Sequence, residues 1–229
     1  VNKGNYAEAI KLDHTNRDDI YSKLIQSFTS DSKLDADEDN FIINEIKSPD
    51  PIKKNDNNYG RCMYEIANAY WLYYSPYEDD TDGMTEDEQK DYAVRRELEL
   101  EEKRISKSYE WFEKAVSGTD LRESMPEAYK RAQIFLNIGK FYNDIDRMEK
   151  EGTDSREFYE HMWKNIEEMS EYIDESNEVV SVRVCQTLLS LVSRYSAKFR
   201  QNGVDAASQE HILEHINRKV YQGGEISYS

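Results

Sequence analysis

Two histidines near the end of the chain stand at a spacing that suits a metal ion. His211-Ile-Leu-Glu214-His215 reads H-x-x-E-H, the inverted form of a zinc-peptidase motif. Histidines at i and i+4 on a helix can bind zinc, and Glu214 would serve as the base. A third ligand is needed, and Glu225 is the one carboxylate that follows. A hydrated helix face explains the pattern more simply, so a metal-binding enzyme using His211 and His215 stays an alternative, and no cofactor is predicted.

A second candidate for chemistry is the acidic stretch Pro76–Gly83. Glu78, Asp80, Asp82 and Gly83 occupy the first, third, fifth and sixth places of a calcium loop. The residue that should close such a loop is a bidentate Glu, and here it is Gln89. The stretch is therefore interpreted as a solvated acidic loop.

The composition narrows the classes of partner. The formal charge is 30 − 47 = −17, and a strongly acidic surface repels nucleic acid and anionic lipid. A protein or peptide partner fits better. Cys62 and Cys185 lie in apolar helical runs and are predicted to be buried thiols. No apolar run approaches about 18 residues, so no membrane span is expected.

The apolar residues repeat with helical spacing throughout, which predicts an all-α fold without a sheet. In Tyr59–Ser75, for example, Met63, Ile66, Ala67 and Tyr70 fall on one stripe. Helices are predicted over residues 18–29, 41–46, 59–75, 86–116, 127–145, 158–173 and 178–200, and from 205 to about 222.

The helix from Glu86 is unusually long. Thr85 and Glu88 form a capping box at its start. Its first half, Gln89–Arg104, is mostly charged and is expected to be solvated, whereas Ser108, Phe112 and Ala115 have the spacing of a packing helix. A single domain is expected over residues 1–229, with an insertion and long helix over 76–104.

These spacings resemble the tetratricopeptide repeat, a helix-turn-helix unit that stacks into an α-α superhelix. Glu127–Tyr142, with Phe135, Ile138, Gly139 and Tyr142, matches best. The stripe of Tyr59–Ser75 paired with Ser108–Ala115 matches next. Asn5–Asn16 resembles the end of a repeat, which suggests a piece of a longer protein. The repeats are divergent, because Ile25 and Val192 replace the usual small residue.

Five segments in order resemble the C-terminal repeat region of membrane-anchored serine/threonine protein kinases of Gram-positive bacteria. They are AIKLDHTN, YEIANAYWLYYS, WFEKAV, NIGKFYNDI and RYSAKFRQNGV. The resemblance implies an extracytoplasmic sensor or partner-binding region, and the chain itself contains no kinase motif. A free cytoplasmic scaffold with the same fold is the first alternative.

Repeats of this family line a concave surface with their first helices, which implies a binding groove here. If Tyr70 faces the core, Trp71 and Tyr64 point elsewhere and are free to bind, with Trp71 partly exposed. The expected groove binds an extended peptide or a small anionic ligand. Its residues are Arg61, Tyr64, Asn68 and Trp71, joined by Lys140 and Asn143.

Overall fold

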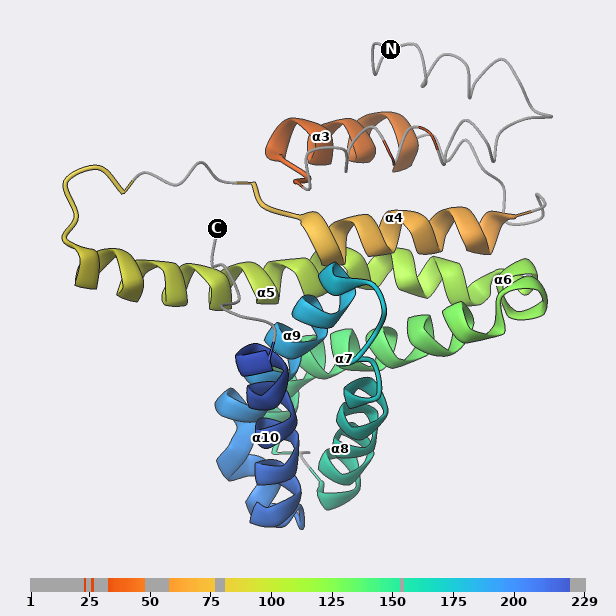
Figure 1. Cartoon of the computed structure of the whole chain (residues 1–229). Coiled ribbons are helices and arrows are strands. Elements are labelled where there is room, and N and C mark those ends of the chain that lie inside the picture. The colour runs from red at the N-terminus through yellow and green to blue at the C-terminus, as the bar shows by residue number, and fades with distance from the viewer. Residues whose placement is uncertain are drawn as a thin grey trace. The chain divides into compact units, whose positions relative to one another are not determined.

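The regular structure of the chain is helical. The computed structural model describes residues 23, 26, 33–47, 58–76, 81–152 and 155–222. Over these ranges every regular element is a helix (Figure 1), and one isolated parallel bridge joins Leu34 to Tyr74. The all-α prediction is confirmed. The prediction for Asn5–Asn16, most of the helix predicted over 18–29, and Glu78 and Asp80 of the calcium loop lie outside the described residues.

Most helix bounds agree with those expected from the periodicity, but α7 continues six residues past the expected end at residue 145, and the helical stretch expected over 41–46 begins at Ala36. In chain order the elements are α3 (Ala36–Phe41), the π-helical turn η1 (Ile42–Lys47), α4 (Tyr59–Tyr73), α5 (Glu86–Ser117), α6 (Thr119–Ser124), α7 (Pro126–Glu151), α8 (Arg156–Ser170), α9 (Glu178–Gln201) and α10 (Ala206–Gln222). The periodicity missed the short helix α6, because six residues are too few to show a repeat. It also missed most of α3, because Ala36–Asn40 contains no large apolar residue.

Side chains that cap the first turns fix where several helices begin. At α5 the backbone N–H of Thr85 donates to Glu88 Oε2 at 2.9 Å, and the N–H of Glu88 donates to Thr85 Oγ1 at 3.4 Å, which confirms the capping box. Asp205 Oδ1 accepts the N–H of Ser208 at 2.7 Å before α10. Asp35 and Glu38 form a further capping box at α3.

The helices form two compact units. Unit 1 comprises residues 1–83 and 104–136, and unit 2 comprises residues 84–103 and 137–229. Helices α5 and α7 each contribute one half to each unit. The superhelical stacking of repeats and the single domain therefore stay predictions.

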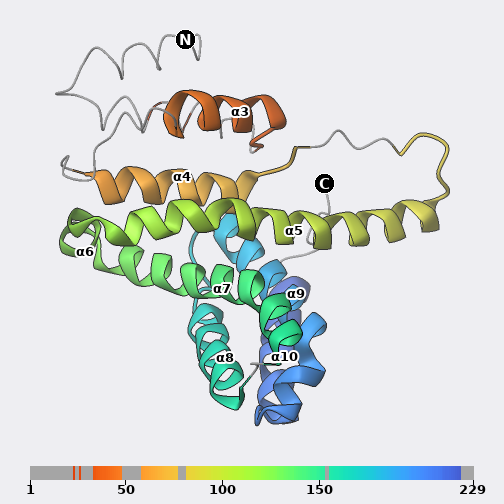
Figure 2. The same cartoon turned by 180° about the vertical axis from the view of Figure 1, so that it is seen from behind.

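The core of unit 1 is built around α4. Eleven of its fifteen residues are buried, including the predicted stripe of Met63, Ile66, Ala67 and Tyr70. Helix α4 lies along the second half of α5 (Figures 1 and 2), where Ser108, Phe112 and Ala115 are buried as predicted. A helix buried to this extent is packed on more than one side.

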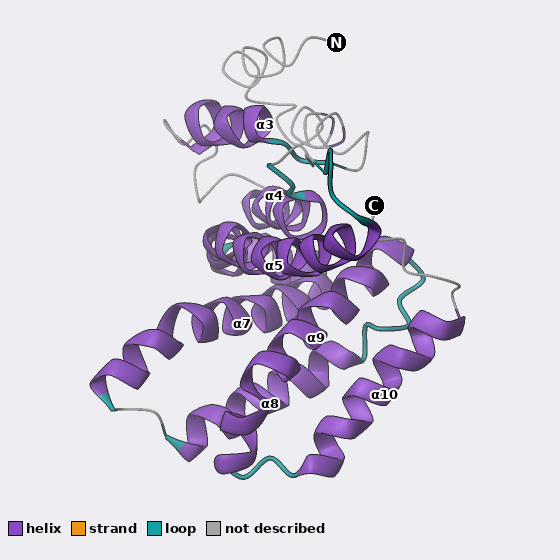
Figure 3. Ribbon diagram, turned by 90° about the vertical axis from the view of Figure 1, so that its left-hand side faces the viewer, coloured by secondary structure: helices purple, strands orange, loops and turns teal. Residues whose placement is uncertain are grey.

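The core of unit 2 is centred on the ring of Phe141 in α7. This ring stacks on Phe158 of α8 and Phe199 of α9, with centroids 5.3 and 6.1 Å apart, and meets Tyr195 edge-on at 4.9 Å. Both arrangements are favourable for aromatic quadrupoles. Helix α9 has α8 and α10 as neighbours (Figure 3), so unit 2 has a rigid aromatic base on which polar side chains can be positioned.

Candidate functional site

The candidate site is a line of polar residues along α9 in unit 2. Arg183, Thr187, Ser190 and Arg194 recur at intervals of four, three and four residues, so they share one face of the helix. We call these four residues the polar row. The neighbouring stripe of Val184, Leu188, Leu191 and Tyr195 is buried in the core. The apolar stripe therefore holds α9 in place while the polar row meets other elements.

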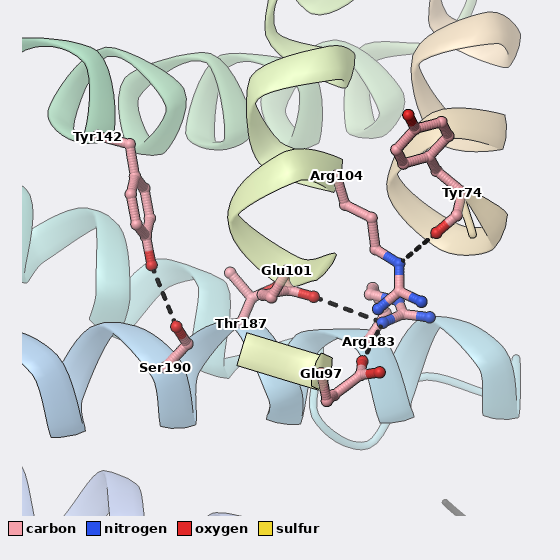
Figure 4. A network of polar contacts seen from close by, with 8 residues as sticks. All are labelled: Tyr74, Glu97, Glu101, Arg104, Tyr142, Arg183, Thr187 and Ser190. Carbon is pink, nitrogen blue, oxygen red and sulfur yellow. Dashed lines mark hydrogen bonds and ion pairs between the residues drawn. The ribbon is translucent and has the colours of Figure 1, made fainter. Parts of the chain in front are cut away.

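Most of the polar row contacts the first half of α5. Arg183 Nη1 lies 3.0 Å from Glu97 Oε1 and 3.4 Å from Glu101 Oε2 (Figure 4). The hydroxyl of Thr187 donates to Glu101 Oε1. Arg194 Nη1 donates to Glu102 Oε2 at 2.9 Å, in an exposed pair. Two cations and a hydroxyl of α9 thus bind three carboxylates of one helix.

Burial makes the contact at Glu101 different from a surface ion pair. The side chain of Glu101 is 1% exposed and that of Arg183 is 11% exposed. A carboxylate buried to this extent requires a cation and hydrogen-bond donors, since desolvation otherwise makes its charge costly. Arg183 and Thr187 supply both, so they select an acidic residue at this position.

Ser190 joins the polar row to α7. The hydroxyls of Ser190 and Tyr142 lie 3.3 Å apart (Figure 4). Burial raises the pKa of Tyr142, and the charge of Glu101 adds to that rise, while the hydrogen bond to Ser190 opposes it. Tyr142 therefore stays a neutral hydroxyl over the whole ordinary pH range. It was predicted to be a core residue, and it is half-buried with this polar contact.

These contacts correct one expectation about α5. The residues from Gln89 to Asp91 are exposed as predicted, but Leu100, Glu101 and Arg104 are buried. The expectation that Gln89–Arg104 is solvated is therefore wrong at its C-terminal end. The charge of that end is neutralised by partners far away in the sequence rather than by water. Glu97 and Glu101 on α5, and Arg183 and Thr187 on α9, each stand at i and i+4, and that pairing is the signal that could have revealed the site.

Unit 1 holds a separate polar cluster around Asp39 of α3. Lys107 Nζ lies 2.7 Å from Asp39 Oδ2, and the hydroxyl of Tyr70 donates to Asp39 Oδ1 at 2.8 Å. Burial and the carboxylate of Asp39 raise the pKa of Tyr70 and of Tyr74. The backbone oxygen of Tyr74 also accepts from Arg104 Nε at 2.9 Å. These contacts attach α3 and the end of α4 to α5.

Two aromatic residues of the predicted groove lie in the core instead. Trp71 is 2% exposed, and its ring centroid lies 4.1 Å from that of Phe135 in α7. Tyr64 is buried and meets Phe112 edge-on at 6.1 Å. The prediction that Trp71 is partly exposed is wrong because α4 is packed on several sides, whereas the sequence argument allowed it only one buried stripe.

The polar members of that predicted groove remain at or near the surface. Arg61 is exposed and pairs with Glu65 at 3.2 Å, and Asn68 is half-buried. Lys140 and Asn143 are exposed on the half of α7 that belongs to unit 2. The six residues are therefore divided between the two units. Within unit 2, Lys140 and Asn143 come from the same helix as Tyr142, the residue bonded to the polar row.

The histidine motif is engaged in a surface contact. His215 Nε2 lies 2.9 Å from Asp174 Oδ2, Lys219 Nζ lies 3.7 Å from Asp174 Oδ1, and His211 is exposed. Over the described residues, no group of three or more His, Cys, Asp or Glu side chains is placed to hold a metal ion. Glu225, the expected third ligand, lies outside the described ranges.

Two other expectations concern thiols and membranes. Cys62 and Cys185 are buried free thiols, as predicted, and burial raises the pKa of Cys185 to about 11. Among the described helices, none combines the length and the apolar character needed to cross a membrane.

Known proteins give no further guide to the site. No protein-family model, no curated protein and no solved structure matches this chain.

Proposed function

We propose that the chain is a non-catalytic helical-repeat module that binds a protein or peptide partner. The observation that carries the proposal is the way the polar row of α9 holds α5 in unit 2. Arg183, Thr187 and Arg194 bind three carboxylates presented by a helix. A rigid helix face that binds charged side chains of another helix has the chemistry of a protein-recognition surface.

The proposed architecture is a divergent tetratricopeptide-like array. The stripes predicted for α4, α7 and α9 supply buried residues in each helix, as the repeat pattern requires. Pairs of neighbouring helices, such as α8 with α9 and α9 with α10, are compatible with stacked helix-turn-helix units. Proteins of this architecture bind partners along an extended inner surface.

For the location of the module, the resemblance to receptor kinases favours an extracytoplasmic sensor region. A free cytoplasmic scaffold is the alternative, and the same binding chemistry would serve it. The neighbouring reading frame distinguishes them, because a kinase domain and a membrane helix encoded upstream would support the receptor, and an uninterrupted cytoplasmic scaffold gene would exclude it.

The exposed side chains of Lys140 and Asn143 on α7 are the proposed points of partner contact in unit 2. Lys140 offers a cation and Asn143 an amide, a combination that suits carboxylates or the polar groups of a peptide backbone. A small anionic ligand would be recognised by the same groups. The contribution of Lys140 should be mainly Coulombic and so should decrease with salt.

The test is a selection of helical and extended peptides against the whole chain, followed by calorimetry. Lys140→Glu is expected to weaken binding of the selected peptides, and the loss should shrink at high salt. Lys150→Glu is the matched control, since Lys150 is an exposed lysine of the same helix. A selection that yields no binder, or binders that both variants retain equally, would contradict the proposed function or this placement of its surface, respectively.

A further inference from the structure

The first half of α5 is attached to unit 2 almost entirely through charges. Residues 84–103 are all described, and among them only Leu100 and Glu101 are buried. Residues 86–103 include eight acidic and four basic side chains. Glu97, Glu101 and Glu102 hold this segment to α9 through their contacts with the polar row. Little apolar surface fixes it there.

A segment held in this way differs from a core helix in its ability to be exchanged. Apolar burial is the dominant stabilising contribution in a core, and here Leu100 is the one apolar side chain of residues 86–103 that is fully buried, while Tyr92 and Ala93 are half-buried. Exposed ion pairs such as Arg194–Glu102 add little and are screened by salt. The buried charge of Arg183 nevertheless has to keep a carboxylate partner, because an uncompensated buried charge is strongly destabilising.

We propose that the polar row is a partner-binding site in addition to the contacts of Lys140 and Asn143, and that the first half of α5 occupies it in the isolated chain. The partner class follows from the contacts: an acidic helix with two glutamates one turn apart, like Glu97 and Glu101, and a third carboxylate beside the second. Such a helix supplies three carboxylates in place of those of Glu97, Glu101 and Glu102, which leave the polar row with α5. This inference rests on the proposed function, and it adds an autoinhibitory role for residues 86–103 and a chemical class for the partner.

The geometry assigns separate tasks to the residues of the row. Arg183 and Thr187 recognise the buried carboxylate, since both contact Glu101. Arg194 reads the exposed one through Glu102. A basic helix would bring like charges against Arg183 and Arg194, so it is excluded as an occupant.

The test uses a labelled synthetic peptide of residues 86–103 and the whole chain, with binding followed by fluorescence anisotropy. The parent is expected to bind the peptide weakly, because its own α5 fills the site. The variant Glu97→Gln/Glu101→Gln should bind the peptide at least about tenfold more tightly. Its own α5 competes less well for the polar row, so the fraction of molecules whose polar row is open to the peptide rises. Adding Arg183→Gln to that variant should remove the gain.

Matched controls decide the outcome. A peptide with glutamine in place of both glutamates should not bind the double variant, and circular dichroism must show that the variants keep the parent's helix content. If the double variant unfolds, Glu97→Gln alone is used, because Glu97 is only half-buried. A folded variant that fails to bind the peptide, or binds both peptides equally, overturns the inference. The peptide selection and its Lys140→Glu readout are independent of this result, so the proposed function would then stand or fall separately.

Discussion

The backbones of Gly60 and Gly118 touch each other in unit 1. A Cβ built on Gly118 would lie 2.6 Å from the Cα of Gly60 and 2.7 Å from its nitrogen. Gly118 has a φ of −81°, so its backbone suits any residue, and the close approach alone requires glycine there. This contact brings the start of α4 against the turn that leads into α6.

Gly118→Ala should therefore destabilise the protein by displacing a backbone rather than a flexible side chain. Overpacking of this kind costs about 1–3 kcal/mol or more. Chemical denaturation monitored by circular dichroism measures the change. Gly152→Ala is the informative comparison. A Cβ added at Gly152 would have no neighbour within 4 Å, but the residue has a φ of 64°. Gly152→Ala should lower the free energy of unfolding only by the cost of a left-handed backbone conformation at alanine, about 1–2 kcal/mol. Equal unfolding curves for the parent and Gly118→Ala would refute the contact.

The same contact places Asp120 of α6 at the N-terminus of α4. Its two carboxylate oxygens accept the backbone N–H groups of Gly60 at 2.8 Å and Arg61 at 3.1 Å. Asn58, the residue at the N-cap position, has a φ of 66°, and its side chain accepts no capping hydrogen bond. Asp120 thus takes the place of an N-cap residue from a distant part of the chain.

Asp120→Ala should reduce the free energy of unfolding by about 0.5–2 kcal/mol, the usual effect of losing an N-cap. Glu123→Ala is the control, since Glu123 is an exposed acid of the same short helix. Urea denaturation of both variants compares them. If both lose the same amount, the effect is one of charge or helix propensity, and the capping role is wrong.

Trp71 should behave as a core residue. Truncating a buried aromatic costs about 3–5 kcal/mol, so Trp71→Ala and Phe112→Ala are both expected to lose that much, since both side chains are buried against Phe135. Leu98→Ala, at a half-exposed position of α5, should change stability by less than about 0.5 kcal/mol. Thermal unfolding of the three variants measures which of them loses the most stability. A small loss of stability in Trp71→Ala would contradict the burial of Trp71 and favour the prediction that its side chain is partly exposed.

The sequence predicted which residues are buried better than it predicted which are exposed. The stripe of Met63, Ile66, Ala67 and Tyr70 followed from helical spacing alone, because that spacing places residues on one face whatever lies opposite. Trp71 was misplaced because its burial depends on Phe135, which is distant in sequence. The polar row was missed for the same reason, since Arg183 is neutralised by Glu97 and Glu101, some eighty residues earlier.

Glu101→Gln should be far more costly than Glu102→Gln, although the two residues are adjacent. Glu101 is buried against Arg183, and removing one partner of a buried pair typically costs about 3–5 kcal/mol. Glu102 is half-exposed in its pair with Arg194, for which about 0–1 kcal/mol is usual. Guanidinium denaturation should separate the two variants clearly. Similar losses would mean that Glu101 is hydrated in solution.

The contact between Asp174 and His215 should make stability depend on pH in the acid range. The hydrogen bond from His215, together with the charges of His215 and Lys219, lowers the pKa of Asp174 below its ordinary value of about 3.9. A carboxylate whose pKa is lower in the folded state binds its proton less readily there than in the unfolded state. Its contribution is therefore complete above about pH 4 and is lost as the pH falls through the folded-state pKa.

The measurement is the difference in unfolding free energy between the parent and Asp174→Asn across the acid range. The parent should be the more stable protein near pH 6, and the difference should shrink as the pH falls below about 4 and through the folded-state pKa of Asp174, where its carboxylate takes up a proton. Glu210→Gln, an exposed change on α10, controls for the loss of one negative charge from an acidic chain. A gap between parent and Asp174→Asn that does not shrink at all as the pH falls below about 4 would mean that the asparagine disturbs the loop before α9 sterically, and that the ion pair with His215 contributes nothing.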